Sequence, residues 1–342
     1  MLPTPASFRI GQRSKGHLVN LHHRSKLDIL LTRARVTNLG FLILAAFAVL
    51  SFLVNLSYYF SEPSGGSIAK ALDAFGHAPD SILATIHRDD ALKGLNHLIV
   101  VPGHGIWKGW SKDQALAEDK WILEQYQQGG GRVQAWVSHI ETGAELARVD
   151  ENALVVFSGG QTRQNSTTTE AESYLRLASQ TGTFGAQPGL FRRATTEDHA
   201  LDSFQNLLFS IARFHEYTGS YPELITVVGY EMKRRRFTEL HRAALRWPAE
   251  RFHYIGIDPD KEVPAARDGE RQNGYLPYTL DTYGCHDMLQ SKRRSRNPFF
   301  RYHSYYTSSP ELGGLFNWCP GPREGGHTVL YPGPLPWYTP PR

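Results

Sequence analysis

The chain has 342 residues, enough for one large domain or two small ones, and its 20% charged and 41% hydrophobic residues are ordinary for a globular protein. The net charge of +4 is unevenly spread, because residues 1–38 hold seven Lys or Arg side chains against the single acid Asp28. Without this tail the chain is close to neutral, which argues against a nucleic-acid-binding surface. With only two cysteines, Cys285 and Cys319, the chain has neither a disulfide framework nor a thiolate zinc site.

A long apolar stretch at residues 39–60 follows the basic tail. It is 22 residues long, carries no charge, and ends in Tyr58, Tyr59 and Phe60, which resemble an interfacial aromatic belt. A bilayer span needs about 20 such residues, so the stretch predicts a single transmembrane helix. A buried core helix stays open as an alternative. A cleaved signal peptide is disfavoured, because the basic region is long and no small-x-small site follows.

Basic residues lie mainly on the N-terminal side of this stretch. Four Lys or Arg side chains precede it closely, whereas Lys70 alone follows within 20 residues. The positive-inside rule therefore predicts a single-pass membrane protein with a cytosolic N-terminus and, in a eukaryote, a C-terminal domain in the ER or Golgi lumen. The glycosylation triplet at residues 165–167 fits a lumen. Residues 61–94 form a predicted linker with a short helix near 68–75.

From residue 95 onward the hydrophobic pattern alternates between buried strands and amphipathic helices. Strands are predicted at 96–101, 153–157, 224–229 and 252–257, with an extended piece at 190–194. Helices are predicted at 112–128 (ended by Gly129 to Gly131), 137–147, 169–179, 204–214 and 233–246. This alternation predicts an α/β domain at residues 95–260 with a doubly wound, mostly parallel sheet. The extension at residues 261–342 is expected to wrap around it, with Cys285 and Cys319 either bonded or free.

Ligands of such sheets bind at the carboxyl ends of the strands, which places four segments on one rim. The segments are Gly103-His104-Gly105, Ser158-Gly159-Gly160, Glu197, and Tyr230 to Arg236. The glycines are either an anion cradle of backbone N–H groups or plain tight turns. His104 is either an acid–base group or a surface histidine. Ser158 lacks the G-x-S-x-G setting of a nucleophile.

Charged residues on this rim also have two interpretations. Glu197 and Asp198 either take part in chemistry or favour the N-terminus of a helix capped by a preceding threonine. The run from Lys233 to Arg236 either is a solvated face or holds an anionic substrate. The sequence contains no H-E-x-x-H motif or other metal-ligand spacing, no Walker loop and no G-x-G-x-x-G fingerprint.

Together these motifs resemble the SanA/YdcF/ElyC-like family, a domain family of unknown function, and most closely its fungal membrane-anchored branch. The resemblance covers roughly residues 95–260, and a tail motif at 283–299 is typical of that branch. The family's glycine loop corresponds to residues 102–105. Its Ser-Gly-Gly turn, with a Glu on the next helix, corresponds to residues 158–160 with Glu170 or Glu172.

Two further family motifs are altered in this chain. The Glu-x-x-Ser-x-x-Thr-x-x-Asn run corresponds to Glu197, Ala200, Ser203 and Asn206, so Ala200 replaces the family's Ser and Ser203 its Thr. The closing Ser-x-x-His-x-x-Arg run corresponds to Tyr230, Lys233 and Arg236, so a lysine replaces the histidine. The resemblance implies a Rossmann-like fold. Through bacterial relatives, it also suggests binding of S-adenosylmethionine and a link to cell-envelope and lipid-carrier metabolism.

Three functions follow as hypotheses. The first is an enzyme, a hydrolase or transferase, that acts on a phosphate-bearing or lipid-linked substrate with Glu197, Glu172 or His104 as acid or base. The second is a non-catalytic module that binds S-adenosylmethionine or a nucleotide, and the third is an anchored interaction protein. The residues expected to bind the ligand are Gly103, Gly105, Ser158, Gly159, Gly160, Ser203, Asn206, Tyr230, Lys233 and Arg236.

Overall fold

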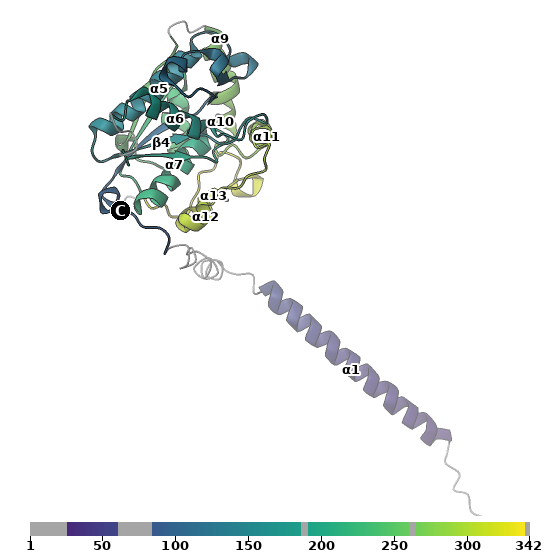
Figure 1. The fold of residues 1–342 in the computed structure, drawn as a ribbon. Helices are drawn as coiled ribbons and strands as arrows, with labels where there is room; N and C mark the ends of the chain where they lie inside the picture. Colours follow the sequence, from purple (N-terminus) through teal and green to yellow (C-terminus); the bar gives the residue numbers. More distant parts are fainter. Residues whose placement is uncertain (1–25, 61–83, 186–190, 260–263, 339–342) are drawn as a thin grey trace, which may run out of the picture. The chain divides into compact units, whose positions relative to one another are not determined.

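The computed structural model describes residues 26–60, 84–185, 191–259 and 264–338, with side chains in the first range described from 39 to 57. Contacts within the chain define two compact units, residues 1–69 and 70–342. The first unit contains helix α1 (Lys26–Phe60), and the second is a mixed α/β domain (Figure 1).

Helix α1 is 35 residues long, and its stretch Leu39–Ser57 is long and apolar enough to cross a membrane. None of this stretch is buried in protein; Phe41, for example, is 81% exposed. A core helix would bury its apolar side chains, so the alternative of a buried core helix is wrong. The short helix predicted near 68–75 lies outside the described residues.

The second unit is built on a five-stranded sheet in which every strand is parallel to its neighbours. The strands are β1 (His97–Pro102), β4 (Ala153–Ser158), β5 (Ala194–Glu197), β6 (Leu224–Gly229) and β7 (Phe252–Gly256). Their spatial order is β5-β4-β1-β6-β7. Counted along the chain this is the order 3-2-1-4-5 of Rossmann-like folds, so the predicted fold class is confirmed.

Helices cover both faces of the sheet, because the inner strands are apolar on both sides. In β1, Ile99 and Val101 face one apolar cluster while Leu98 and Val100 face the other. The first cluster is covered by α5 (Arg132–Val149) and α6 (Glu170–Thr181), and the second by α7 (Ser203–Thr218). The alternation follows from the two-residue period of a strand.

The helix predicted at 112–128 is wrong. The segment forms three 3-10 turns and strand β3 (Trp121–Ile122), which pairs antiparallel with β2 (Ile106–Trp107). The turns are η1 (Lys112–Gln114), η2 (Glu118–Lys120) and η3 (Gln125–Gln127). Trp121 explains the difference, because its buried ring packs 5.5 Å from that of Trp136 and its Nε1 donates to the carbonyl of Ala115. Packing of a large aromatic outweighs weak helix propensity.

Gly129, Gly130 and Gly131 do not end a helix, as predicted, but lead into one. All three have positive φ, and Gly131 is the N-cap of α5. The helix predicted at 137–147 is therefore confirmed but starts earlier, at Arg132.

Two further boundaries differ from the prediction. Thr195, Thr196 and Glu197 belong to β5, and α7 is capped instead by Asp202, whose carboxylate accepts from the N–H of Gln205. The predicted basic helix at 233–246 is divided into η5 (Glu231–Lys233), a π-helical turn η6 (Arg236–His241) and α8 (Arg242–Ala244).

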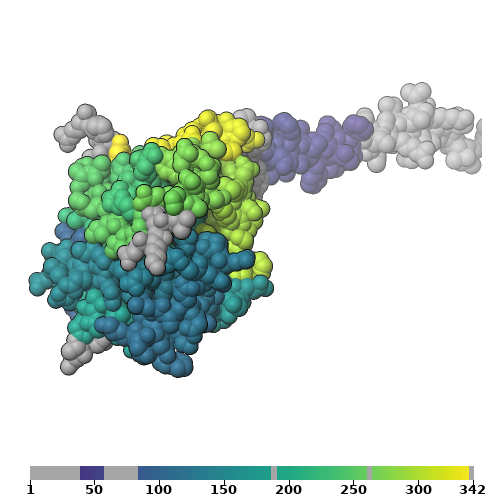
Figure 2. All heavy atoms as spheres, turned by 90° about the horizontal axis from the view of Figure 1, so that it is seen from above, coloured from purple at the N-terminus to yellow at the C-terminus, as the bar shows by residue number. Residues whose placement is uncertain are grey.

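The C-terminal extension packs on the sheet domain and belongs to the same compact unit. Tyr278, Leu312 and Trp337 join the core cluster that contains α7. In Figure 2 the green and yellow C-terminal surface lies directly against the blue and teal part of the domain. The short elements are α4 (Asp90–Lys93), η7 (Ala249–Arg251), α9 (Pro264–Glu270), η8 (Arg271–Tyr275), α10 (Leu276–Leu280), α11 (Asp287–Ser295), α12 (Tyr305–Ser308), η9 (Pro310–Leu312), α13 (Gly313–Phe316) and η10 (Pro322–Glu324).

Candidate functional site

A cavity of about 590 Å³ lies at the carboxyl edge of the sheet, between the loops that follow β1 and β6. The strand order reverses at this point, where open α/β sheets bind their ligands. Seven of the predicted site residues line the cavity: Gly103, His104, Ser203, Asn206, Tyr230, Lys233 and Arg236. Gly105, Ser158, Gly159, Gly160, Glu172 and Glu197 do not.

The cavity lining is rich in basic side chains. Six basic residues face three acidic ones: Arg132, Arg163, Lys233, Arg236, Lys292 and Arg296 against Glu170, Asp202 and Glu270. Each acid already has a basic partner. Arg236 pairs with Glu270 at 3.1 Å, Arg163 with Glu170 at 3.8 Å, and Asp202 with Arg293. Among the described residues, the other four lining cations form no salt bridge. They are Arg132, Lys233, Lys292 and Arg296.

Lys233 is the most perturbed of these cations. Its Nζ lies 5.2 Å from the centroid of the Tyr230 ring, and its surroundings include Arg236 and Arg296. Burial, reinforced by the charge of Arg236, lowers the pKa of Lys233 to about 7. The ammonium is disfavoured because water has been removed and like charges are close. The negative charge of a bound anion would favour the ammonium and raise this pKa.

His104 lies in a cluster of aromatic rings at the base of the cavity. Its ring stacks on Tyr230 at 5.0 Å, and Trp136 lies 5.9 Å away. Burial lowers the pKa of His104 well below its usual value, so the imidazole is neutral at pH 7. His139, next to it, is also neutral, since burial lowers its pKa to about 4. The Nε2 atom of His104 is buried without a hydrogen-bond partner.

The sequence left open whether the glycines are an anion cradle or plain tight turns, and the N–H groups of Gly103, Gly159 and Gly160 favour tight turns. The N–H of Gly103 donates to the carbonyl of Ser158 at 2.6 Å, that of Gly159 to Glu197 at 2.9 Å and that of Gly160 to Ala200 at 2.8 Å. The first N–H groups of α6 donate in turn to the carbonyls of Gly160 and Gly159. These donors are satisfied within the protein and are not available to a ligand.

Close packing explains the glycines instead. A Cβ atom at Gly103 would lie 2.6 Å from the Cβ of Glu170, and one at Gly159 would lie 2.8 Å from its Oε2. A Cβ atom at Gly105 would lie 2.9 Å from the ring of Trp136. These approaches are too short for any larger residue, so the glycines let the loops pack on α6 and α5.

Glu197 is fully buried at the end of β5, behind the cavity wall. Its carboxyl group receives the backbone N–H groups of His199 and Ala200 and lies 2.7 Å from the Oγ of Ser158. Burial raises its pKa to about 7. The same Ser158 Oγ lies 2.9 Å from the Oδ1 of Asn206, which does line the cavity. Glu197 is therefore connected to the cavity through neighbouring residues, Ala200 directly and Asn206 by way of Ser158.

The structure separates the two glutamates of α6. Glu172 is exposed and forms a capping box with Thr169, in which each side chain accepts from the other's backbone N–H. Glu170 lines the cavity and accepts from the hydroxyl of Thr162. The placement of Glu172 fits a helix cap. Ser203 lines the cavity with its hydroxyl 2.8 Å from the Nε2 of His241.

Sequence reasoning missed several lining residues. Glu270, Lys292 and Arg296 come from α9 and the α11 region of the C-terminal extension, which was expected only to wrap the domain. A run of basic residues at 292–296 was the available signal. Arg132 and Arg163 follow glycine-containing turns, and no motif distinguished them.

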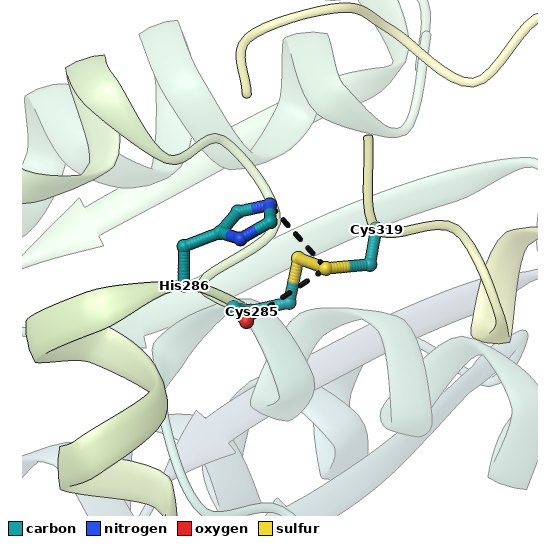
Figure 3. A group of neighbouring side chains, drawn as sticks. All are labelled: Cys285, His286 and Cys319. Carbon is teal, nitrogen blue, oxygen red and sulfur yellow. Dashed lines mark hydrogen bonds between the residues drawn. A yellow bond between two sulfur atoms is a disulfide. The ribbon is translucent and has the colours of Figure 1, made fainter. Parts of the chain in front are cut away.

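The extension is held by a disulfide between Cys285 and Cys319, with Cα atoms 5.9 Å apart (Figure 3). This settles the alternative that the sequence left open. His286 directs its Nε2 toward Cys319, 3.4 Å from the Sγ, and the same atom lies 2.9 Å from the carbonyl oxygen of Pro320. Both sulfurs are consumed by the bond, so they offer no thiolate to a metal. The disulfide lies just before α11, which carries Lys292.

Comparison with known proteins gives a relative without an assigned activity. No protein-family model matches the chain, and no solved structure matches it. The uncharacterized protein YOR238W of Saccharomyces cerevisiae is 31% identical over 260 residues, which is 61% of this chain and 86% of the yeast protein.

Proposed function

The chain belongs to the family of the uncharacterised yeast protein YOR238W, and we propose that its cavity binds a phosphate-bearing small molecule. One observation carries the proposal: four lining cations, Arg132, Lys233, Lys292 and Arg296, have no salt-bridge partner among the described residues. Lysine and arginine hold phosphate through charge-assisted hydrogen bonds, which are stronger than neutral ones. The position at the strand-order reversal supports the same conclusion.

The charge of the cavity favours phosphate over S-adenosylmethionine. That cofactor carries a sulfonium and an ammonium against one carboxylate, so it is a net cation. An excess of basic groups around it would raise its free energy of binding, whereas a phosphate would neutralise them. A nucleotide stays within the proposed class, because it carries phosphate and its base can stack on the exposed ring of Tyr126 at the cavity.

An enzyme, a hydrolase or transferase, is the second candidate function. Lys233, with its pKa lowered to about 7, lines the same cavity as the carboxylates of Glu170 and Glu270. A group whose pKa lies near the working pH can both give and take a proton during a reaction. Lys233 and Glu170 thus replace Glu197 and Glu172 as acid–base candidates, since the latter two do not line the cavity.

Isothermal titration of the full-length chain in detergent micelles tests the binding proposal. The ligands are pyrophosphate, a nucleoside monophosphate and S-adenosylmethionine, and we expect the first two to bind. Lys233→Gln should weaken them by about tenfold, the usual loss for a charge-assisted hydrogen bond. Arg235→Gln is the control, because Arg235 is exposed and pairs with Glu239 outside the cavity. Failure of both phosphate compounds to bind contradicts the proposal.

Turnover decides between an enzyme and a binding module. The same preparation is assayed for phosphate release from pyrophosphate and from a nucleoside monophosphate. Release that Lys233→Gln and Glu170→Gln both abolish supports an enzyme. Tight binding without release leaves a binding module.

We also propose that α1 is a single-pass anchor that leaves the domain in an endomembrane lumen. Its length and the basic residues before it support this, as do the disulfide, which suits an oxidising compartment, and the exposed Asn165 of the glycosylation triplet. Glycosidase treatment should shift the mobility of the wild-type chain but not of Asn165→Gln. Complete protease digestion of the domain in intact microsomes would contradict the orientation.

Assignment to the SanA/YdcF/ElyC-like family remains a proposal. It is supported by the glycine loop after β1, the Ser-Gly-Gly turn after β4 and the arrival of Asn206 and Arg236 at one cavity of a Rossmann-like sheet. A YdcF-like protein whose matching residues lie away from such a cavity would contradict it.

A further inference from the structure

A basic and aromatic segment follows the part of α11 that lines the cavity. Between Asp287 and Glu311 the chain has no acidic residue, five Lys or Arg residues and five Phe or Tyr residues. This composition differs from that of the domain as a whole, which is close to neutral. Basic and aromatic residues together are typical of surfaces that meet a lipid headgroup region.

Two aromatic side chains of this segment, Phe300 and Tyr302, point outward. Tyr302 is 93% exposed and Phe300 83% exposed, and the arginines on either side of Phe300 in the sequence, Arg294 and Arg301, are exposed too. Leaving two large aromatic rings in water forgoes the free energy that their burial would release. Such exposure indicates a surface that is covered in another state of the protein.

Hydrogen bonds within residues 297–301 stabilise the turn that exposes Phe300. Phe300 has a φ of 52°, a left-handed conformation that is rare for a bulky residue and raises its conformational energy. Asn297 holds the turn, because its Oδ1 accepts from the N–H of Arg301 at 2.9 Å and its Nδ2 donates to the carbonyl of Arg301 at 3.1 Å. Hydrogen bonds on both sides thus maintain an exposed and strained phenylalanine.

Both ends of the segment are fixed to the domain. Before the loop, Arg296 donates to the carbonyl of Leu201 at 3.0 Å. After it, Tyr305 is 2% exposed and packs 5.5 Å from Phe209 of α7, and its hydroxyl lies 3.3 Å from Glu197. The exposed rings therefore project from a segment that is fixed at both ends, between α11 and α12 (Figure 1).

We propose that the segment from Arg294 to Tyr306 docks on the anionic surface of a lipid bilayer, that of the membrane that holds α1. The proposal rests on the proposed anchor, which would keep the bilayer at a high effective concentration near the domain. The arginines attract anionic headgroups, and the phenylalanine and tyrosine rings suit the interfacial layer. Because α11 also carries Lys292, docking brings the phosphate-binding cavity close to the membrane surface.

Hydrogen exchange of the full-length chain in lipid nanodiscs tests this proposal. One set of discs contains phosphatidylcholine alone, and the other also contains phosphatidylserine. In the anionic discs, amides of residues 297–303 should exchange on the order of tenfold more slowly than in detergent, and the neutral discs should give a smaller effect. The double substitution Phe300→Ser with Tyr302→Ser should abolish the slowing.

Trp110→Ser is the matched control, because Trp110 is a 76% exposed aromatic residue outside the segment, and it should leave the slowing intact. Equal exchange in anionic discs, neutral discs and detergent overturns the proposal. The exposed segment would then be interpreted as a surface that binds another protein. Slowing that persists in the double variant overturns it as well. Slow exchange of α1 amides in the discs tests separately whether α1 is inserted in the bilayer. Pyrophosphate titration of the same sample tests whether the cavity binds phosphate.

Discussion

The two walls of the cavity differ in how they are made. The sheet wall consists of loops that follow β1 and β6 and the start of α7, and it contributes His104, Tyr230 and Lys233. The C-terminal wall consists of α9 to α11 and the residue that follows, and it contributes Glu270, Lys292 and Arg296. The sheet wall sets where the cavity lies, because strand ends converge there. The C-terminal wall adds two of the four lining cations that have no salt-bridge partner among the described residues, and so increases the positive charge of the cavity.

Several contacts join the two walls. Arg236 pairs with Glu270, Asp202 pairs with Arg293, and Arg296 donates to the carbonyl of Leu201. Behind the sheet wall, the hydroxyl of Tyr305 reaches Glu197. The disulfide acts within the C-terminal wall. Substitutions at these positions can show whether the walls behave as one unit or as two.

Asp202→Ala should have the largest effect on stability. Asp202 caps α7 and pairs with Arg293, both partners being largely buried. Removing one partner leaves a buried charge, which costs about 3–5 kcal/mol of unfolding free energy. Urea unfolding of the full-length chain measures this. Glu239→Ala, which breaks the exposed pair with Arg235, should cost at most about 1 kcal/mol. Equal losses would mean that the walls are not coupled through Asp202.

Removing the disulfide should cause the next largest loss of stability. It closes a loop with a sequence separation of 34, and the chain-entropy model gives roughly 4 kcal/mol for a loop of that length. The double substitution Cys285→Ser with Cys319→Ser should lower the melting temperature and weaken pyrophosphate binding, since it loosens the base of α11. An unchanged affinity with lowered stability would show that the C-terminal wall keeps its shape without the bond.

Glu197→Gln tests the contact behind the sheet wall. The pKa of Glu197 is raised to about 7, so in the wild type the folded state binds more protons than the unfolded state between the usual 4.5 and 7. Stability should therefore fall as pH rises through this window, by up to roughly 3 kcal/mol. The glutamine variant should lack this decline in unfolding measurements near pH 5 and pH 7.5. A variant with the same pH profile as the wild type contradicts the raised pKa.

The smallest expected effect concerns Lys233 and the pH dependence of binding. Sulfate is the probe, because its charge does not change near neutral pH. Lys233 loses its proton above about pH 7, so sulfate affinity should fall by up to tenfold per pH unit beyond that point. Lys233→Gln should bind weakly at every pH, and Arg235→Gln should keep the wild-type profile. A pH-independent affinity in the wild type would remove Lys233 from the anion site.

Particular residues show how far sequence reasoning reached. The strand ends at Val101 and Gly229 were readable because buried parallel strands are continuous apolar runs, and the rim residues His104, Lys233 and Arg236 followed from them. The helix at 112–128 failed because Trp121 is buried by residues distant in sequence. The prediction that Glu197 lies at the carboxyl edge of the sheet is confirmed, since β5 ends there. The local sequence does not determine whether its side chain points into the cavity or away from it, and in the structure it is fully buried.

The amino-acid pattern was sufficient for the α/β class, the parallel sheet, the apolar N-terminal helix and the edge of the sheet that holds the cavity, because each depends on local periodicity and strand order. It was insufficient for the cavity's composition. Glu270, Lys292 and Arg296 meet Lys233 only when the C-terminal extension folds back, and no periodicity relates them. The glycine N–H groups, the depressed pKa of Lys233 and the exposed Phe300 likewise depend on three-dimensional neighbours, since hydrogen bonding, desolvation and exposure are properties of the packed chain.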